Sequence, residues 1–440
     1  MEKYNFILKN FHSIKSADIN LNGITVLAGE NGCGKSTITR WIYYIVECLV
    51  HFEDYAFKDF KEAFSDLLRQ VDMVRRELLL RRDSANIDVI SPQKLRNRLQ
   101  NSVLSDPNEA ERFFQVYEDM LVQLSNLLEE ALRNISDVRR RRLMAYIGID
   151  ENMPFDRNEF IQTYLKRGVE CYENYLTMCN QRSIKSLYRY FQYFDDGLDI
   201  PIDMHFFESG VDMLGKKSVE HLLNIERVFY VDTPMVLARF NFDVGNILWD
   251  TFRGVMLQKP QEIPTKESRK MIRRIQTIID GSVVLDTDNL DDELRFIREE
   301  DKLNIPIEET ATGIKSFAYI LRLLENDLLN GKTLLIIDEP EAHLHPQWIV
   351  EFARVLVLLH KELGVRVLIT SHNPDMVAAI QSISQRESVI SDLTFYQAEK
   401  SEVHYRYNYQ NLKQDISNIF QSFNIALTRI QDYGAMGDLQ

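Results

Sequence analysis

The stretch Gly29–Thr37, which reads GENGCGKST, decides how the rest of the chain is interpreted. It fits the pattern G-x-x-x-x-G-K-[ST], in which a glycine-rich turn surrounds a phosphate group with backbone N–H groups. The apolar run 24–28 before it predicts a buried strand, and apolar residues at helical spacing over 36–50 predict a helix after it. Strand, loop and helix together predict an anion-binding site at the start of that helix.

The chemistry of this loop points to a nucleoside triphosphate with Mg²⁺. We expect Lys35 to reach the β- and γ-phosphates and the Ser36 hydroxyl to coordinate the metal. The residues predicted to bind the nucleotide are the loop positions from the third onward: Asn31, Gly32, Cys33, Gly34, Lys35, Ser36 and Thr37.

Composition limits the class of protein. The chain has 440 residues, is 45% hydrophobic and 27% charged, and carries a net charge of −14, as a globular protein of two or more domains would. The acidic total argues against a surface that attracts nucleic acid everywhere, although it permits a local basic groove. The four cysteines show no metal-like spacing, and no apolar run is long enough to span a bilayer. A reduced, cytoplasmic protein without a membrane segment is therefore expected.

The chain divides into three parts by pattern. Residues 1–51 hold short strands, the phosphate loop and its helix. Residues 52–222 are poor in glycine and rich in charge, with apolar residues at helical spacing over 57–82, 107–133, 136–147 and 157–194. This part predicts a large helical insertion with antiparallel, coiled-coil-like pairing as one option. Strand patterns return in residues 223–440, so the predicted fold class is α/β, a mixed sheet flanked by helices.

Two basic clusters lie in the predicted insertion. The first contains Arg75, Arg76, Arg81 and Arg82, and the second is the run Arg139–Arg142. Contact with nucleic acid or with an acidic partner is one interpretation. Pairing with neighbouring acids on a solvated helix face is the simpler one, and we favour it.

A second strand carries the other half of the predicted site. The buried run 333–337 is followed by Asp338 and Glu339. Asp338, at the carboxyl end of a parallel strand, is predicted to hold Mg²⁺ directly or through water. Glu339 is predicted to orient or deprotonate the attacking water, which together with charge neutralisation is what phosphoryl transfer requires.

Three histidines come shortly after predicted strands. His372 comes directly after the strand run 365–370, at the edge of the sheet where ligands of α/β proteins gather, and is predicted to donate to the γ-phosphate. His343 and His345 have the spacing of metal ligands but no third ligand nearby. We therefore interpret them as loop residues rather than as a zinc site.

Three motifs together resemble one known class. GENGCGKST, LLIIDEPEAHLHP (334–346) and LITSHNP (368–374) are similar to the motifs of ABC-class ATPases of the SMC, recombination-repair and overcoming-lysogenisation-defect type. The resemblance covers residues 1–50 and 280–400, with fragments near 225–235, and leaves out the helical insertion. It implies an ABC-type head, ATP and Mg²⁺ as ligands, and two nucleotides sandwiched in a head-to-head dimer.

The resemblance also assigns further residues. That class has a signature helix whose start caps the γ-phosphate of the ATP bound by the other protomer. Here Thr312, Gly313 and Lys315 stand at the matching positions, with Ile314 in place of the second glycine and Lys315 in place of the glutamine. His372 matches the switch histidine, and Leu344-His345 falls in the inter-subunit loop. The glutamine loop has no clear match, and Gln93 is its weak candidate.

The combination of ATGIKS and DEPEAHLHP is most similar to stand-alone ATPases of bacterial anti-phage systems, such as Septu and retron operons. That similarity implies a homodimer or higher homo-oligomer that controls a separate, nuclease-like effector, with DNA or a phage component as a further contact.

Four functions were weighed. The leading hypothesis is an ATPase, converting ATP and water to ADP and phosphate, that couples nucleotide-driven dimerisation to an effector in anti-phage defence. The alternative is a DNA-repair ATPase that acts directly on DNA. A transporter subunit is disfavoured by the long interval between Ser36 and Asp338, and a fused nuclease by the short segment after His372.

Overall fold

A computed structural model describes the chain in ten stretches, and every structural statement below concerns these residues. They are 3–79, 92–101, 106–133, 135–148, 154–195, 197–232, 254–260, 263–287, 293–342 and 344–421. The chain separates into two compact units. We call Met1–Val50 with Ser183–Gln440 the sheet unit, and His51–Arg182 the helical unit.

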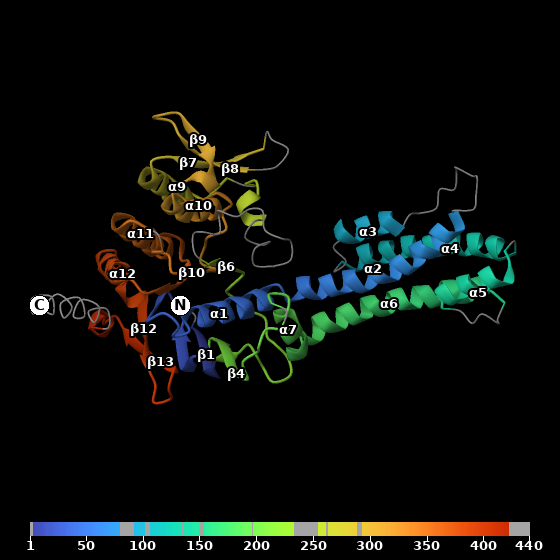
Figure 1. Ribbon diagram of the computed structural model, residues 1–440, viewed down its shortest axis with the longest axis horizontal. Coiled ribbons are helices and arrows are strands. Elements are labelled where there is room, and N and C mark those ends of the chain that lie inside the picture. Colours follow the sequence, from blue (N-terminus) through green and yellow to red (C-terminus); the bar gives the residue numbers. More distant parts are fainter. Residues whose placement is uncertain are drawn as a thin grey trace, which may run out of the picture. The chain divides into compact units, whose positions relative to one another are not determined.

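The sheet unit contains a mixed sheet of ten strands in the order β5-β4-β1-β2-β13-β12-β3-β11-β10-β6 (Figure 1). The strands are β1 (Tyr4–Phe11), β2 (Ile14–Asn20), β3 (Ile24–Ala28), β4 (Asp203–Glu208), β5 (Val211–Asp212), β6 (Arg227–Asp232), β10 (Thr333–Asp338), β11 (Arg366–Ser371), β12 (Leu393–Lys400) and β13 (Tyr407–Lys413). Strands β3, β6, β10 and β11 run parallel, and β12 is parallel to β3. The fold is therefore the predicted α/β class with a mixed sheet.

The parallel strands are buried on both faces. Every residue of β3 and β10 is buried, which explains why they read as continuous apolar runs. One face packs against α9 (Lys266–Ile279), α10 (Thr312–Glu325), α11 (Pro346–Leu363) and α12 (Pro374–Arg386) in a single apolar cluster. Helix α1 (Lys35–Val50) packs on β6, β10 and β11 and contributes nothing to that cluster, so it covers the opposite face.

Smaller elements complete the sheet unit. Strands β7 (Ser282–Asp286), β8 (Glu293–Arg298) and β9 (Leu303–Pro306) form a separate antiparallel sheet, which lies above α9 and α10 in Figure 1. Short 3-10 turns, η2 (Ile307–Glu309) and η3 (Ile390–Asp392), precede α10 and β12. Helix α7 (Ile184–Phe191) packs on α1 through an edge-to-face contact between Phe191 and Trp41.

The helical unit is shorter than the predicted insertion, which extended to residue 222. Strand β4 pairs with β1 in antiparallel register from Glu208↔Tyr4 to Asp203↔Lys9. Residues 183–222 therefore belong to the sheet unit. The prediction missed β4 because a six-residue strand, DMHFFE, with alternating burial does not stand out from amphipathic helix patterns.

Helices of the helical unit agree with most of the predicted segments. They are α2 (Phe52–Leu79), α3 (Pro92–Asn101), α4 (Pro107–Arg133), α5 (Asp137–Tyr146) and α6 (Arg157–Gln181). Helix α3 was not predicted, and the predicted helix 157–194 is broken at Arg182, whose φ is 40°.

Aromatic side chains hold α2 against α6. Phe57 and Phe60 contact Tyr175, and Phe60 also contacts Tyr172 one turn earlier in α6. Residue numbers rise along α2 as they fall along α6, so the two helices are antiparallel (Figure 1). Gly168 of α6 allows both α2 and α4 to approach closely, because a Cβ there would lie 3.1 Å from Phe64 of α2 and 2.8 Å from the Tyr117 ring of α4.

Candidate functional site

The predicted site residues meet at one edge of the sheet because the parallel strands are in register. Ser371 at the end of β11 is opposite Ala28 at the end of β3, and Thr370 is opposite Asp338 at the end of β10. The phosphate loop, Glu339 and His372 each begin one residue beyond these positions. Adjacent strands are about 4.8 Å apart, so the three segments lie within about 10 Å of each other.

The phosphate loop has the backbone geometry that its glycines were expected to allow. Gly32 and Gly34 have φ values of 83° and 96°, in the left-handed region where a side chain is strained. Asn31 and Gly32 are exposed, whereas Ser36 and Thr37 are half-buried at the start of α1. The Lys35 ammonium donates to the carbonyl oxygens of Gly29 at 2.9 Å and Glu30 at 3.1 Å, so it lies over the loop.

The turn between β1 and β2 and a side chain of β13 both contact the phosphate loop, and the sequence did not predict either contact. A Cβ on Gly34 would lie 2.8 Å from Ser13 and Ile14, at the turn between β1 and β2. The buried Tyr409 hydroxyl of β13 donates to the Cys33 carbonyl at 3.3 Å and lies 3.7 Å from its Sγ. Cys33 is thus a buried packing residue of the loop, which Tyr409 holds in place.

Asp338 is buried and held by two hydroxyl groups. Thr370 of β11 donates to its Oδ1, and Tyr230 of β6 donates to its Oδ2 at 3.3 Å. Burial, with Asp338 nearby, raises the pKa of the Tyr230 phenol well above its ordinary value, so this hydroxyl remains a donor. The carboxylate is therefore fixed in orientation at the sheet edge.

Glu339 turns out of the strand with a φ of 49°. A non-glycine residue in this region is strained by about 1–3 kcal/mol, and such strain is frequent at active sites. The Glu339 N–H donates to the Thr370 hydroxyl at 3.0 Å, which stabilises the turn. Its Oε1 lies 3.3 Å from Nδ1 of His372, and both side chains remain accessible. The structure thus brings the predicted base and the predicted switch histidine together.

A further carboxylate at this edge escaped the sequence analysis. Asp232 ends β6 directly opposite Asp338 and forms an ion pair of 3.0 Å with Arg40 of α1. Burial raises the pKa of the Asp232 carboxyl, and Arg40 opposes that shift. The signal was the single acid that closes the strand run 227–232, but only the sheet order shows that this strand lies beside β10.

The start of α10 holds the signature-like residues. Ala311 precedes the helix without a side-chain cap, so the first N–H groups, at Thr312 and Gly313, are left for another acceptor. The Lys315 ammonium, by contrast, is buried and donates to the Glu308 carbonyl at 2.7 Å. Burial lowers the pKa of Lys315. Nucleotide contact by these three residues stays a prediction.

Gly313 has a packing role within its own chain. A Cβ at this position would lie 2.5 Å from the indole ring of Trp348 in α11. We expect overpacking in Gly313→Ala to lower the free energy of unfolding by about 1–3 kcal/mol. The higher helix propensity of alanine offsets about 1 kcal/mol of this loss. Thermal unfolding measures the change, and Trp348→Ala should remove the penalty. The packing role would be contradicted if Gly313→Ala changed the melting temperature equally in the wild-type and Trp348→Ala backgrounds.

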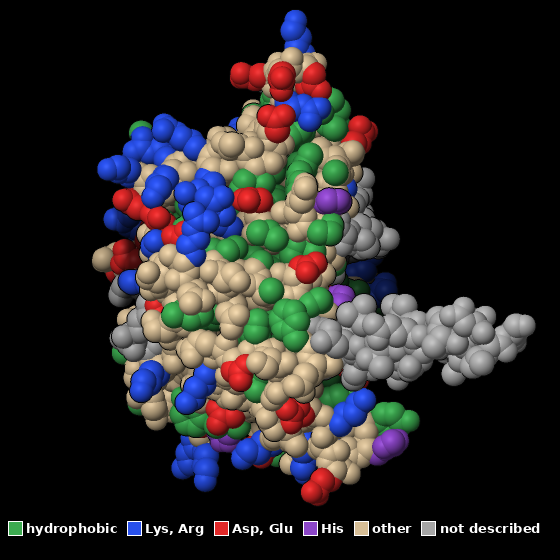
Figure 2. Space-filling model, turned by 90° about the vertical axis from the view of Figure 1, so that its left-hand side faces the viewer, with side chains coloured by type: hydrophobic (Ala, Val, Ile, Leu, Met, Phe, Trp, Pro, Cys, Tyr) green, Lys and Arg blue, Asp and Glu red, His purple; other side chains and the backbone are tan. Residues whose placement is uncertain are grey.

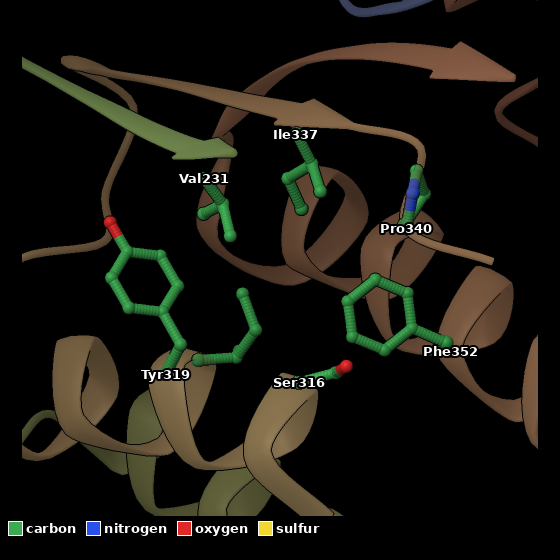
Figure 3. A pocket seen from close by; sticks show the side chains of 7 residues that line it. Val231, Ser316, Tyr319, Ile337, Pro340 and Phe352 are labelled. Atoms are coloured by element: carbon green, nitrogen blue, oxygen red, sulfur yellow. The ribbon is translucent and has the colours of Figure 1, made fainter. Parts of the chain in front are cut away.

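The contact between α10 and the turn after β10 is apolar. Figure 3 shows the side chains of Val231 and Ile337 facing Ser316 and Tyr319 across a small hollow. Its volume is about 10 Å³ and its lining exposes almost no polar surface, so it is too small and too apolar for a ligand. Helix α10 therefore packs directly against the end of β10 and the turn 339–342 that follows it, which we call the acidic turn.

The sequence analysis also singled out His345, His343 and Gln93. His345 caps the start of α11, where its Nδ1 accepts from the Gln347 N–H at 3.4 Å. His343 lies outside the described residues. Gln93 is in α3 of the helical unit. No group of three or more His, Cys, Asp or Glu within the described stretches is placed to hold a metal ion.

Two family models match the two halves of the chain. An AAA ATPase domain model matches residues 1–193, and an AAA domain model described as putative AbiEii toxin, type IV TA system, matches residues 207–378. The first match contains the phosphate loop, and the second contains Asp338, Glu339 and His372. Both halves of the chain are therefore similar to AAA ATPase domains.

A curated relative is similar to this chain over most of its length. The retron Vc95 probable ATPase of Vibrio cholerae serotype O1 biovar El Tor is 22% identical over 418 residues, which are 88% of this chain and 72% of that protein. The chain is thus similar to a retron ATPase, in agreement with the resemblance of its motifs.

Solved structures show partial likeness. The SMC head bound to the C-winged helix domain of ScpA is 11% identical, with a TM-score of 0.36 over 96% of this chain and 100% of that one. The SMC head domain from Thermotoga maritima is 12% identical, with a TM-score of 0.34 over 94% and 99%. A nucleotide-free ATP-binding cassette of an ABC transporter is 11% identical, with a TM-score of 0.34 over 96% of this chain and 96% of that one.

None of the described helices has the length and apolarity to cross a membrane.

Proposed function

We propose that this chain binds ATP with Mg²⁺ and hydrolyses it at the edge formed by β3, β10 and β11. The observation that carries the proposal is the shared register of these strands, which places the phosphate loop, the acidic turn and His372 side by side. Lys35 exchanges its carbonyl partners for phosphate oxygens. Glu339 orients and deprotonates the attacking water, and His372 donates to the terminal phosphate.

Ser36 and Asp338 are the proposed metal ligands. Both oxygens of Asp338 already accept hydrogen bonds, which favours contact with Mg²⁺ through a water molecule. The metal neutralises charge on the phosphates. We expect chelation by EDTA to lower ATP hydrolysis at least about 100-fold, and excess Mg²⁺ to restore it. Phosphate release measures the rate, and turnover that persists in EDTA would contradict the proposal.

The start of α10 supports dimerisation driven by nucleotide. Its first N–H groups have no side-chain cap, and anions are stabilised at such helix ends. We infer that Thr312 and Gly313 face the γ-phosphate held by a second copy of the chain, so that two nucleotides complete the dimer. Light scattering should show a doubled mass with Mg-ATP and a single mass with ADP.

A role in anti-phage defence is proposed from the relatives. The curated relative is a retron ATPase, and one family model is described as a putative toxin of a type IV system. We propose that ATP-driven dimerisation in the cytoplasm controls a separate, nuclease-like effector. Co-expression of the chain with the neighbouring gene products, followed by pull-down with ATP or ADP, tests the effector.

A second candidate function is direct contact with DNA, which two surfaces favour. Arg139–Arg142 in α5 form no ion pair within the described residues, whereas Arg75 and Arg76 both pair with Asp72. Pairing with neighbouring acids, the interpretation that we favour from the sequence, therefore holds for Arg75 and Arg76. The described ion pairs give it no support for Arg139–Arg142. Arg81 and Arg82 lie outside the described residues.

The second basic surface is on α9, which carries cations at positions that share one side of a helix. They are Lys266, Arg269, Lys270 and Arg273, all exposed, and Figure 2 shows Lys and Arg side chains gathered at the height of α9 and α11. Of these four α9 cations, only Lys270 forms an ion pair with another described residue, namely with Glu362 at 2.9 Å.

A salt-dependent titration with a labelled mixed-sequence duplex separates these possibilities. If DNA is bound, the logarithm of affinity should fall linearly with that of salt, by about 0.9 per phosphate contacted. Changing Arg139–Arg142 to glutamine, or the four α9 cations to glutamine, should reduce the slope for the surface that makes the contact. Identical slopes for both variants and the wild type would leave effector control as the function.

A further inference from the structure

Glu341 is a buried acid that the proposed mechanism does not use. It lies two residues after Glu339, in the turn between β10 and α11, and its side chain is only 2% exposed. Its side chain is far less exposed than that of Glu339, at 29%, or that of His372, at 42%. A carboxylate rarely occupies such a place without specific partners.

The partners of Glu341 are on the neighbouring strand end. Its Oε1 accepts a hydrogen bond of 2.7 Å from the Ser371 hydroxyl and one of 3.0 Å from the His372 backbone N–H. Ser371 is fully buried, and its hydroxyl also accepts from the Asn373 N–H at 3.1 Å. One oxygen of Glu341 therefore fixes the whole turn Ser371–Asn373 against the acidic turn.

The same oxygen lies beside the histidine ring. Nδ1 of His372 is 3.3 Å from Oε1 of Glu339 and 3.7 Å from Oε1 of Glu341. The ring is thus placed between the proposed base and the buried acid. Glu341 thus accepts a hydrogen bond from the His372 backbone and also lies near its ring, whereas Glu339 is near the ring alone.

Burial makes this arrangement costly. Oε2 of Glu341 has no hydrogen-bond partner in the described part of the chain, and burial raises the pKa of the carboxyl while donation from Ser371 opposes the shift. An apolar side chain would fill the same space without that cost. The contribution of Glu341 must therefore come from the hydrogen bonds that its other oxygen accepts.

We propose that Glu341 is the positioning residue of this ATPase, which holds the Ser371–His372 turn so that the His372 ring faces Glu339 and the terminal phosphate. The inference rests on the roles proposed above for Glu339 and His372. Because Glu341 acts through His372, it affects the chemical step and leaves the binding of ATP nearly unchanged.

The test compares Glu341→Ala, Glu341→Gln and Ser371→Ala in the full chain, with steady-state ATP hydrolysis as the readout. Loss of both hydrogen bonds in Glu341→Ala should lower kcat about 10- to 100-fold, while KM for ATP changes less than about threefold. Glu341→Gln should recover most of the rate, because its amide oxygen accepts the same two hydrogen bonds. Ser371→Ala removes one of these hydrogen bonds, so its kcat should lie between those of the wild type and Glu341→Ala.

The matched control is Glu351→Ala in α11, an acid whose ion pair with Arg354 is exposed, and its rate should equal that of the wild type. If Glu341→Ala does not fold, Glu341→Gln and Ser371→Ala still carry the test. Wild-type kcat in Glu341→Ala, or a loss that glutamine fails to recover, would overturn the inference. Lys35→Ala and Glu339→Gln report separately on the proposed function, so its failure is distinguishable.

Discussion

Nucleotide binding should be lost when Lys35 is replaced by alanine, with the dissociation constant for ATP rising at least about 100-fold. The Lys35 ammonium is buried and lies over the phosphate loop, where Gly29 and Glu30 direct it by their carbonyl oxygens. Its removal takes away the cation that neutralises the phosphates and leaves the backbone N–H groups alone. Titration with a fluorescent ATP analogue measures the effect.

The control for this variant is Lys332→Ala. Lys332 directly precedes β10, at the opposite end of the strand from Asp338, and pairs with Glu226. This substitution removes the same charge from the protein but should leave the affinity for ATP unchanged. Binding by Lys35→Ala at wild-type strength would show that the loop does not hold a triphosphate.

Glu339→Gln should separate binding from chemistry. Glutamine has the shape of glutamate but cannot accept the proton of the attacking water, and loss of a general base lowers a rate by about 10²- to 10⁴-fold. The affinity for ATP should remain, because among the described residues Glu339 forms its hydrogen bond and ion pair with Thr370 and His372 and none with the phosphate loop. ATP should then persist between two protomers, and light scattering should detect a stable dimer with Mg-ATP.

Two comparisons make this result specific. Glu351→Gln changes an exposed acid of α11 that lies outside the site, and it should hydrolyse ATP as the wild type does. The double variant Lys35→Ala/Glu339→Gln should remain monomeric, because it cannot load the nucleotide. Normal turnover by Glu339→Gln would remove the role assigned to this residue.

Motifs located the chemistry of the site because they are local. The phosphate loop, Glu339 and His372 each follow a mainly apolar strand, and strands buried on both faces have a continuous apolar pattern. Their meeting at one edge also follows from the rule that parallel strands align their carboxyl ends. The sequence therefore predicted the fold class and the meeting of these segments at one edge of the sheet, and the roles of their residues stay predictions.

Residues that act through long-range contacts could not be predicted in this way. Asp232 joins the site only because β6 is the strand next to β10, and Tyr409 supports the loop only because β13 and β12 pair as a hairpin beside β3. Glu341 lies inside a recognised motif, yet its burial and its bond to Ser371 depend on the neighbouring strand. Nothing in the linear pattern distinguishes these side chains from ordinary strand-end or loop residues.

The place where the helical unit joins the sheet unit has a consequence for the history of such proteins. The chain leaves the sheet unit after α1 and returns at α7, two helices that pack on each other through Trp41 and Phe191. The described residues between them supply no strand to the ten-stranded sheet. Evolution can lengthen, shorten or exchange this segment as a module while the sheet unit keeps its architecture, and laboratory chimaeras joined at residues 50 and 183 can do the same.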